Sequence, residues 1–555
     1  MKKKSIIVFL LFLGSVINAQ NPGEWYKNNL ESGSFGIELQ KANEFLKSKA
    51  VKRSPIVALI GTGADIEHEA LKNSIWSNPK ESADGIDNDK NGYIDDLNGW
   101  NFIGSKDGNI MDFTMQEGDR EWFRLKDKYA DLIFDGTTYF KYIDGVKTDV
   151  PPPSDMEEYG YFKSLMSSKE SQLAGKYAGY AITFLIKDYI QKWDAELKAR
   201  FPGKNRDEIT VEEFVKTVYN KNSPKDSLRD VALSFVGLYA GVTKAYAQDK
   251  TLAVTWENIY DNYTNKQIEF SRKSFEQDLN KWGRDTRKAI VGDDCLNIND
   301  KSYGNNILLT SNSLSGTMLS GIINSIAPEA KMMNLVVSAQ SGEPYLKDIA
   351  LSIRYASDNG ADIILLPQQN SLYPQDQKKW ISEAINYAQS KGALVIVPVW
   401  ENSEDLSKKD YYPSKEMDPA LPLNNLITVA NSDVKGLPSM LSNYGADKLD
   451  IYAPGIDIYS TTPGDLYKTG TSSAFGAGMT AGVAALIKTY YPNLTGVQIR
   501  KLIIENPTSR RGVEVEKGII VGGKRAQDLF LFEQLCKSTG IINANNAIRA
   551  AASVK

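Results

Sequence analysis

The stretch from residue 87 to residue 96 has the residue types and spacing of a cation-binding loop. Oxygen-bearing side chains stand at its first, third and fifth positions, glycine at the sixth, and carboxylates at the ninth and tenth. Calcium takes about six to eight oxygen ligands, and glycine at the sixth position permits the sharp turn that such a loop needs. With the Tyr93 carbonyl at the seventh position, the predicted calcium ligands are Asp87, Asp89, Asn91, Tyr93, Asp95 and Asp96.

This loop is shorter than an EF-hand, because its twelfth position is Asn98 and the last carboxylate must come from Asp95 or Asp96. The ion would have a structural role, since it would tie the preceding strand to the segment that begins at Trp100. The alternative is a solvated acidic turn without metal, in which the short side chains hydrogen-bond to the nearby backbone.

A second candidate for chemistry is Ser472, in the turn Gly470-Thr471-Ser472. A serine hydroxyl is a poor nucleophile unless a base takes its proton, a carboxylate orients that base, and fixed donors hold the oxyanion. Histidine, the usual base, occurs once in the 555 residues, at His68, where a structural role is the simpler interpretation. Lys468 lies four residues before Ser472, and Ser/Lys pairs are a known variant, but a solvated loop lysine is the expected role.

Three apolar segments predict the elements that would position these residues. Residues 56–60 form a short apolar run that ends in a glycine turn at residues 61–63, a pattern typical of a buried parallel strand. Residues 392–399 form a second run of this kind, and an apolar helix through Leu486 follows the Gly-Thr-Ser turn.

Together with residues 314–321, these blocks resemble, in the right order, the motifs of the subtilisin-like serine peptidases, or subtilases. The resemblance covers roughly residues 20–110 and 285–555 and points to envelope and secreted subtilases of Gram-negative bacteria. It implies an α/β fold in which helices sandwich a parallel sheet.

The resemblance also implies that the catalytic groups of the family have been replaced. Gly61 stands where the family has its aspartate, Met318 where we place its histidine, and Glu401 where it has the oxyanion-hole asparagine. Asn402 comes one residue late. Ser472 keeps the Gly-Thr-Ser start, although the helix after it lacks the motif's proline and reaches its glycine two residues late. The chain is therefore interpreted as a catalytically degenerate subtilase, a pseudopeptidase.

The strand that pairs with the substrate in subtilases is altered as well. Pro367, Gln368 and Gln369 replace the usual Ser-Phe-Gly or Ser-Leu-Gly of the family. Proline has no backbone donor, so peptide capture by strand addition would lose at least one hydrogen bond at this point.

The N-terminus predicts export. Three lysines at positions 2 to 4, followed by an apolar run from Ile6 to Leu13, are typical of a signal peptide that is cleaved after Ala19. The expected organisation is a signal peptide (residues 1–19), a first part of the subtilase-like core with the acidic loop (20–114), a helical insertion (115–285) and a second part of the core (286–555).

The insertion is predicted to be mainly helical. Apolar and aromatic residues recur in it at three- and four-residue spacing, which indicates an amphipathic helix whose stripe forms a helix–helix core rather than a partner groove. These residues are Ile182, Leu185, Ile186, Tyr189, Ile190 and Trp193. Residues 210–213 resemble the capping box of another helix, and Pro151 to Pro153 mark a rigid exposed connection.

Composition limits the partners. The net charge is −4 and no basic cluster stands out after the signal peptide, which argues against nucleic acid. No later stretch approaches the roughly 20 apolar residues of a membrane helix. An oxidising compartment would permit a disulfide between Cys295 and Cys536, but their spacing in the sequence does not establish that they are close in the fold.

The sequence therefore predicts a catalytically inactive subtilase homologue that serves as an exported protein- or peptide-binding or scaffold subunit of the bacterial cell envelope. Its expected place is the periplasm, the cell surface or an outer-membrane complex. Two alternatives stay open, namely a serine endopeptidase with a rewired active site and a calcium-stabilised structural module.

Overall fold

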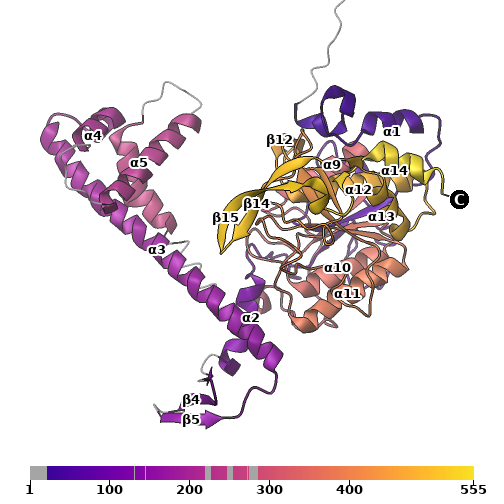
Figure 1. Ribbon diagram of the computed structural model, residues 1–555, viewed down its shortest axis with the longest axis horizontal. Helices are drawn as coiled ribbons and strands as arrows, with labels where there is room; N and C mark the ends of the chain where they lie inside the picture. Colours follow the sequence, from indigo (N-terminus) through magenta and orange to yellow (C-terminus); the bar gives the residue numbers. More distant parts are fainter. Residues whose placement is uncertain are drawn as a thin grey trace, which may run out of the picture. The chain divides into compact units, whose positions relative to one another are not determined.

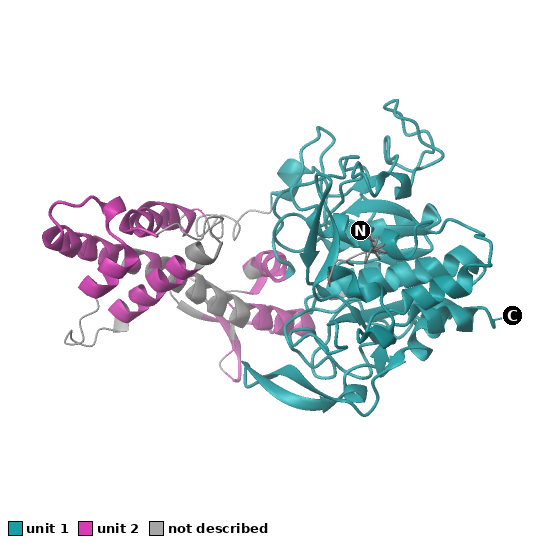
Figure 2. Ribbon diagram, turned by 90° about the horizontal axis from the view of Figure 1, so that it is seen from above, with its two compact units in different colours: residues 1–117, 286–555 teal, residues 118–285 magenta. Residues whose placement is uncertain are grey.

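The computed structural model describes residues 22–129, 132–134, 136–143, 146–218, 227–246, 254–271, 273 and 286–554. The chain folds as two compact units, residues 1–117 with 286–555 and residues 118–285, which are coloured separately in Figure 2. The predicted signal peptide, residues 1–19, lies outside the described residues.

A nine-stranded sheet forms the centre of the first unit, with the strand order β13-β16-β10-β9-β8-β7-β1-β6-β2. Neighbouring strands pair in parallel except for β13, which runs antiparallel to β16. This sheet confirms the predicted α/β fold. The strands are β1 (Ile56–Gly61), β2 (Gly99–Asn101), β6 (Lys331–Val336), β7 (Ile363–Leu365), β8 (Leu394–Pro398), β9 (Leu426–Ser432), β10 (Ile451–Pro454), β13 (Thr508–Ser509) and β16 (Gly540–Ile541).

Helices cover both faces of the sheet, which explains why its strands are apolar on both sides. Alternate residues of β1 belong to two cores: Val57 and Leu59 pack with one set of helices, and Ala58 and Ile60 with the other. The first set is α1 (Leu39–Leu46), α9 (Leu314–Ile326), α12 (Ser473–Tyr490), α13 (Gly496–Glu505) and α14 (Ala544–Ala551) (Figure 1). The second is α10 (Leu346–Asp358) and α11 (Gln375–Ser390).

Helix α12 crosses the sheet closely because small residues line it. A Cβ added at Gly476 would lie 3.1 Å from the Ala430 carbonyl oxygen, and one at Gly478 would lie 2.7 Å from a methyl group of Leu319 in α9. These contacts fix the start of α12, and with it Ser472, against the ends of the central strands.

Two antiparallel hairpins complete the first unit. One joins β11 (Ile458–Thr462) to β12 (Leu466–Gly470), and the other joins β14 (Glu514–Val521) to β15 (Lys524–Leu531). Cys295 and Cys536 form no disulfide with each other, and burial raises the pKa of Cys536 to about 11.

A buried ion network holds the chain where the first unit resumes after residue 285. The Arg287 guanidinium contacts Asp293 at 2.7 Å and Asp348 at 2.6 Å, and Lys347 contacts Asp293 at 2.6 Å. All four side chains are at most 1% exposed. Removing one member would leave an unpaired charge in the core, so the network fixes α8 (Arg287–Ile290) against the start of α10.

The second unit is mainly helical, as predicted. Its described helices are α2 (Glu117–Tyr129, whose first residue belongs to the first unit), α3 (Met156–Arg200), α4 (Val211–Val218), α5 (Ser227–Tyr246) and α6 (Trp256–Asp261), and it also has a small sheet of β3 (Ile133–Phe134), β4 (Tyr139–Ile143) and β5 (Val146–Val150). Ile186, Ile190 and Trp193 are buried in a core with Phe214 and Trp256. The predicted stripe is therefore a helix–helix core within the described side chains.

The capping box predicted at residues 210–213 is present. The Glu213 amide donates to Thr210 Oγ1 at 3.2 Å, and the Thr210 amide donates to Glu213 Oε2 at 3.0 Å. Pro151 and Pro152 are exposed between β5 and α3. No helix in the described part of the chain has the length and apolar content that crossing a bilayer requires.

Candidate functional site

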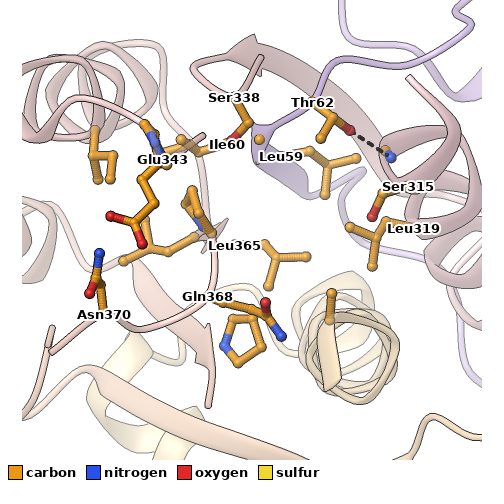
Figure 3. A pocket seen from close by; sticks show the side chains of 18 of the residues that line it. Leu59, Ile60, Thr62, Ser315, Leu319, Ser338, Glu343, Leu365, Gln368 and Asn370 are labelled. Atoms are coloured by element: carbon orange, nitrogen blue, oxygen red, sulfur yellow. Dashed lines mark hydrogen bonds between the residues drawn. The ribbon is translucent and has the colours of Figure 1, made fainter. Parts of the chain in front are cut away.

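A cavity of about 290 Å³ lies at the carboxyl ends of β1, β7 and β8. Crevices at this edge of a parallel sheet are the usual place for ligands in α/β proteins. Its walls come from these strands, from β6, from the first turns of α9 and α10, and from the residues at the start of α12. Figure 3 shows Leu365 and Gln368 between Glu343 and Asn370 on one side and Ser315 and Leu319 on the other.

Gly61 ends β1 and lines the cavity. A Cβ added there would meet no other heavy atom within 4 Å, so the space beside this residue is open. The strand end thus contributes no carboxylate at the position that the resemblance assigns to the catalytic aspartate. The absence of a side chain at Gly61 adds to the volume of the cavity instead.

Helix α9 presents Ser315, and not Met318, to the cavity. Ser315 and Leu319 lie one helical turn apart and both line it, whereas Met318 is only 3% exposed and belongs to the core. The Met318 methyl group would lie 3.1 Å from a Cβ added at Gly470. This geometry corrects the expectation for Met318, because the polar side chain of this helix that lines the cavity is Ser315, three positions earlier.

Glu401 lies just after β8, at the position that the resemblance assigns to the oxyanion donor. Its Oε1 accepts the Ser473 amide at 3.0 Å and the Asn431 side-chain amide at 3.2 Å. Burial raises the pKa of Glu401, while these donors oppose the rise. Asn402 does not replace the missing donor, because its Nδ2 donates to Tyr411 Oη at 2.7 Å. The carboxylate therefore takes up hydrogen-bond donors at the start of α12.

Ser472 lines the cavity and caps α12. Its Oγ accepts the Ala474 amide at 3.1 Å, so the hydroxyl oxygen satisfies one of the free amides at the helix start. The described residues that line the cavity include two carboxylates, Glu117 and Glu343, but no histidine, lysine or arginine. Glu343 Oε2 accepts the Glu117 amide at 2.8 Å.

His68 and Lys468 lie elsewhere. The His68 ring is fully buried, with Nε2 3.2 Å from the Leu466 carbonyl oxygen and Nδ1 accepting the Ala70 amide at 3.1 Å. This is the structural role expected for the single histidine. Lys468 is exposed on β12 and does not line the cavity.

The segment after β7 also lines the cavity. Pro367 follows the strand, and Gln368 Nε2 donates to Ser473 Oγ at 2.6 Å. The same hydroxyl donates to the Val399 carbonyl at 3.0 Å. Gln368 is thus tied to the end of β8 through one buried serine.

The acidic loop gathers a different set of carboxylates from the one predicted. Oxygens of Glu81, Asp89 and Asp96 lie within 4.8 Å of one another. Asp96 is fully buried and accepts from Asn78 Nδ2 and Asn91 Nδ2, both at 2.9 Å. Glu81 is 8% exposed; its Oε1 accepts the Asp89 amide at 2.9 Å, and its buried Oε2 has no hydrogen-bond partner among the described residues.

Of the six predicted ligands, only Asp89 and Asp96 contribute carboxylates to this cluster. Asp87 accepts the Asn91 amide at 3.0 Å and closes a turn, as the alternative interpretation expected. Asn91 serves Asp96 as a donor, and Asp95 accepts amides of the preceding loop. The Tyr93 ring packs in the core, 5.2 Å from the rings of Trp100 and Tyr355. Glu81 was missed because it lies six residues before the motif.

Comparison with known proteins places residues 300–522 in the subtilase family, so the chain carries a subtilase-family domain. It is 29% identical over 184 residues to subtilisin Savinase from Lederbergia lenta, which covers 33% of this chain and 63% of that protein. It is 31% identical over 181 residues to the thermophilic serine proteinase of Bacillus sp. (strain AK1), covering 33% of this chain and 41% of that protein. The chain thus spans less than two thirds of the length of these relatives.

Two solved structures are also similar. The epidermin leader peptide processing serine protease (EpiP) from Staphylococcus aureus matches at 18% identity and a TM-score of 0.36, over 45% of this chain and 65% of that one. The prenylagaramide maturation protease PagA matches at 22% identity and a TM-score of 0.32, over 40% of this chain and 74% of that one.

Proposed function

We propose that this chain is a catalytically inactive subtilase homologue that binds a protein or peptide segment in its degenerate cleft. The observation that carries the proposal is an open cavity in which the two backbone amides that follow Ser472 are already engaged, the Ser473 amide by Glu401 and the Ala474 amide by Ser472 itself. Export to the cell envelope, as a scaffold or binding subunit, is part of the proposal and is supported by the lysine-rich, apolar N-terminus.

The missing base supports inactivity. In subtilisin, loss of the catalytic serine or histidine alone lowers kcat about 2 × 10⁶-fold. From a median turnover of about 10 s⁻¹, that factor leaves roughly one event every few days. Glu401 adds a second obstacle, because a carboxylate where an oxyanion must form repels it.

The retained cavity supports binding. Large core side chains do not fill the space that a missing carboxylate leaves at Gly61, although interiors are normally close-packed. A cleft that had lost all ligands would be expected to close by side-chain repacking.

A cavity-filling variant tests this proposal. Gly61→Phe adds a ring where there is room for it, and Gly203→Phe adds one at an exposed loop that is equally open. Native protein purified gently should retain a stoichiometric partner in the wild type, in Gly203→Phe and in Ser472→Ala, and lose it in Gly61→Phe. Retention by Gly61→Phe, with unchanged thermal stability, would contradict the proposal. Stable labelling of Ser472 by a fluorophosphonate probe would favour the rewired peptidase.

We further propose that Glu81, Asp89 and Asp96 bind a structural calcium ion. The unpaired, buried Oε2 of Glu81 supports this, because a carboxylate oxygen out of water needs a cation or a donor. Three like charges within 4.8 Å also repel each other unless a cation or protons neutralise them. Carboxylate oxygens are the ligands that calcium prefers.

Chelation tests the calcium site. At a hundredfold excess over its Kd, calcium that binds only the folded state stabilises it by about 2.7 kcal/mol, which for a chain of this size corresponds to a Tm change of about 2–3 °C. Glu81→Gln should abolish the response to calcium and chelator, whereas Asp87→Asn should keep it, since Asn still closes the turn. Equal responses in the two variants would contradict the assignment. So would an unchanged Tm when calcium is added to metal-free wild-type protein.

A further inference from the structure

An asparagine without hydrogen-bond partners lines the cavity. Asn334 lies on β6 and is 1% exposed, and neither Oδ1 nor Nδ2 of its side chain has a partner among the described residues. Buried amides are nearly always paired, because an unpaired one has lost its bonds to water without replacement. Each such group in a folded chain calls for an explanation, and a bound ligand is one.

The strand register places Asn334 in an otherwise apolar row. Leu59 of β1 is the register partner of Asn334 on one side and of Leu365 on the other. Register partners in a parallel sheet point to the same face, so the three side chains line the cavity side by side, on the face that α9 covers. Figure 3 shows Leu59, Leu365 and Leu319 facing this space.

The open space at Gly61 leads toward this row. Gly61 pairs with Val336, and Asn334 lies two residues earlier on β6, or about 6.6 Å further from the carboxyl edge at the usual strand rise. A side chain in place of Gly61 would project from the strand end above the row. Its absence leaves room for a group that reaches Asn334 past apolar walls.

The chemistry of Asn334 selects the group that would pair with it. Its side chain offers one acceptor and two donor hydrogens in one plane, so a second carboxamide pairs with it through two parallel hydrogen bonds. A carboxylate would face Oδ1 with no hydrogen to offer, and an ammonium would leave Nδ2 without an acceptor. The leucines beside Asn334 would pack against methylene groups on the way in.

We propose that the cavity takes the side chain of a glutamine in a bound peptide, with its carboxamide paired to Asn334. This inference rests on the proposed binding function and names the ligand that the cleft selects. Glutamine combines two methylene groups, which suit the leucine walls, with the terminal carboxamide that Asn334 requires. It also reaches deeper than asparagine, as the position of Asn334 below the end of β1 demands.

Capped pentapeptides test the proposal, with the sequence acetyl-Ala-Ala-X-Ala-Ala-amide and X as glutamine, glutamate or methionine. Calorimetric titration into the wild type should show the glutamine peptide binding at least tenfold more tightly than the other two. Asn334→Leu should reverse this order in favour of methionine, because the apolar row is then complete. Its Tm should equal or exceed that of the wild type, which also shows that the variant folds.

The outcomes separate this inference from the proposed function. Equal binding of the glutamine peptide to the wild type and Asn334→Leu would overturn the assignment of Asn334, and so would a cavity that holds only water and binds none of the three. If Gly61→Phe still lost its native partner in either case, the cleft would remain the binding site and only the glutamine preference would be wrong. Partner retention by Gly61→Phe would refute the proposed function itself.

Discussion

Lys517 is a buried lysine whose charge state should be visible in the pH dependence of stability. It lies on β14 with no exposed side-chain surface, and its Nζ donates to the carbonyl oxygens of Ser439, Met440 and Ser442 at 2.8, 3.0 and 2.5 Å. Burial lowers the pKa of Lys517 to about 7, and the charge of Glu401 opposes this shift. Burial thus disfavours the charged ammonium form, whereas the charge of Glu401 and the three carbonyl oxygens favour it.

The sign of the pH effect follows from which state holds the proton. The pKa of Lys517 falls from 10.5 in the unfolded chain to about 7 in the folded one. Between these values the unfolded chain binds a proton that the folded chain lacks, so the free energy of unfolding rises with pH. The slope approaches about 1.4 kcal/mol per pH unit, or about 1–2 °C in Tm for a protein of this size. Below pH 7 both states are charged and the contribution is constant.

Calorimetric melting of wild type and Lys517→Met between pH 6 and 9.5 measures this contribution. Lys517→Met should be less stable at every pH, because three carbonyl oxygens lose their donor. The Tm difference between the wild type and this variant should increase by about 1–2 °C per pH unit above pH 7. Lys524→Met, at an exposed position of the same hairpin, should run parallel to the wild type. Parallel curves for Lys517→Met as well would refute the reasoning and show that the carbonyl oxygens keep the ammonium protonated.

Two further predictions concern the cleft. Ser472→Ala should leave partner binding unchanged in a pull-down, because the hydroxyl oxygen is engaged by the Ala474 amide and the described cavity lining holds no histidine or lysine; loss of binding or function with an intact fold would contradict the inactive assignment. The double variant Gly61→Asp with Ser315→His should fold and still fail to hydrolyse casein, because Glu401 keeps the Ser473 amide and Pro367 still lacks a donor. Appreciable hydrolysis would show that the cleft is better preserved than proposed.

The central fold could be predicted from the sequence because its strands are short apolar runs. Residues 56–60 and 394–397 are apolar at every position, and such runs fit strands that helices cover on both faces. The helical insertion was likewise predictable from the spacing around Trp193. Its three short strands were not, since β4 and β5 mix polar and apolar residues without a regular period.

Site residues at the end of a strand could be predicted from the sequence. Those whose position depends on the rotation of a helix about its axis, or on how a loop folds back, could not. Gly61 lies in the cavity because it ends an apolar run, as the sequence suggested. On α9, residues 315 and 318 are almost one turn apart, and only the packing of the helix determines which one faces the cavity. Glu81 reaches Asp89 because the loop folds back, and Asn334 stands in a strand where its neighbours Met333 and Leu335 suggest only core.

The distribution of paired and unpaired groups in the cleft argues for binding over catalysis. A hydrolytic site keeps its donors free and aimed at the place where charge develops, and stability is sacrificed for that readiness. Here Glu401 occupies the Ser473 amide, and Ser472 occupies the Ala474 amide. Among the described residues that line the cleft, the buried side chain without a hydrogen-bond partner is Asn334 on β6. Amides that are already engaged at the start of α12 do not suit the stabilisation of an oxyanion, whereas an unpaired carboxamide in the cavity wall suits the binding of a polar side chain.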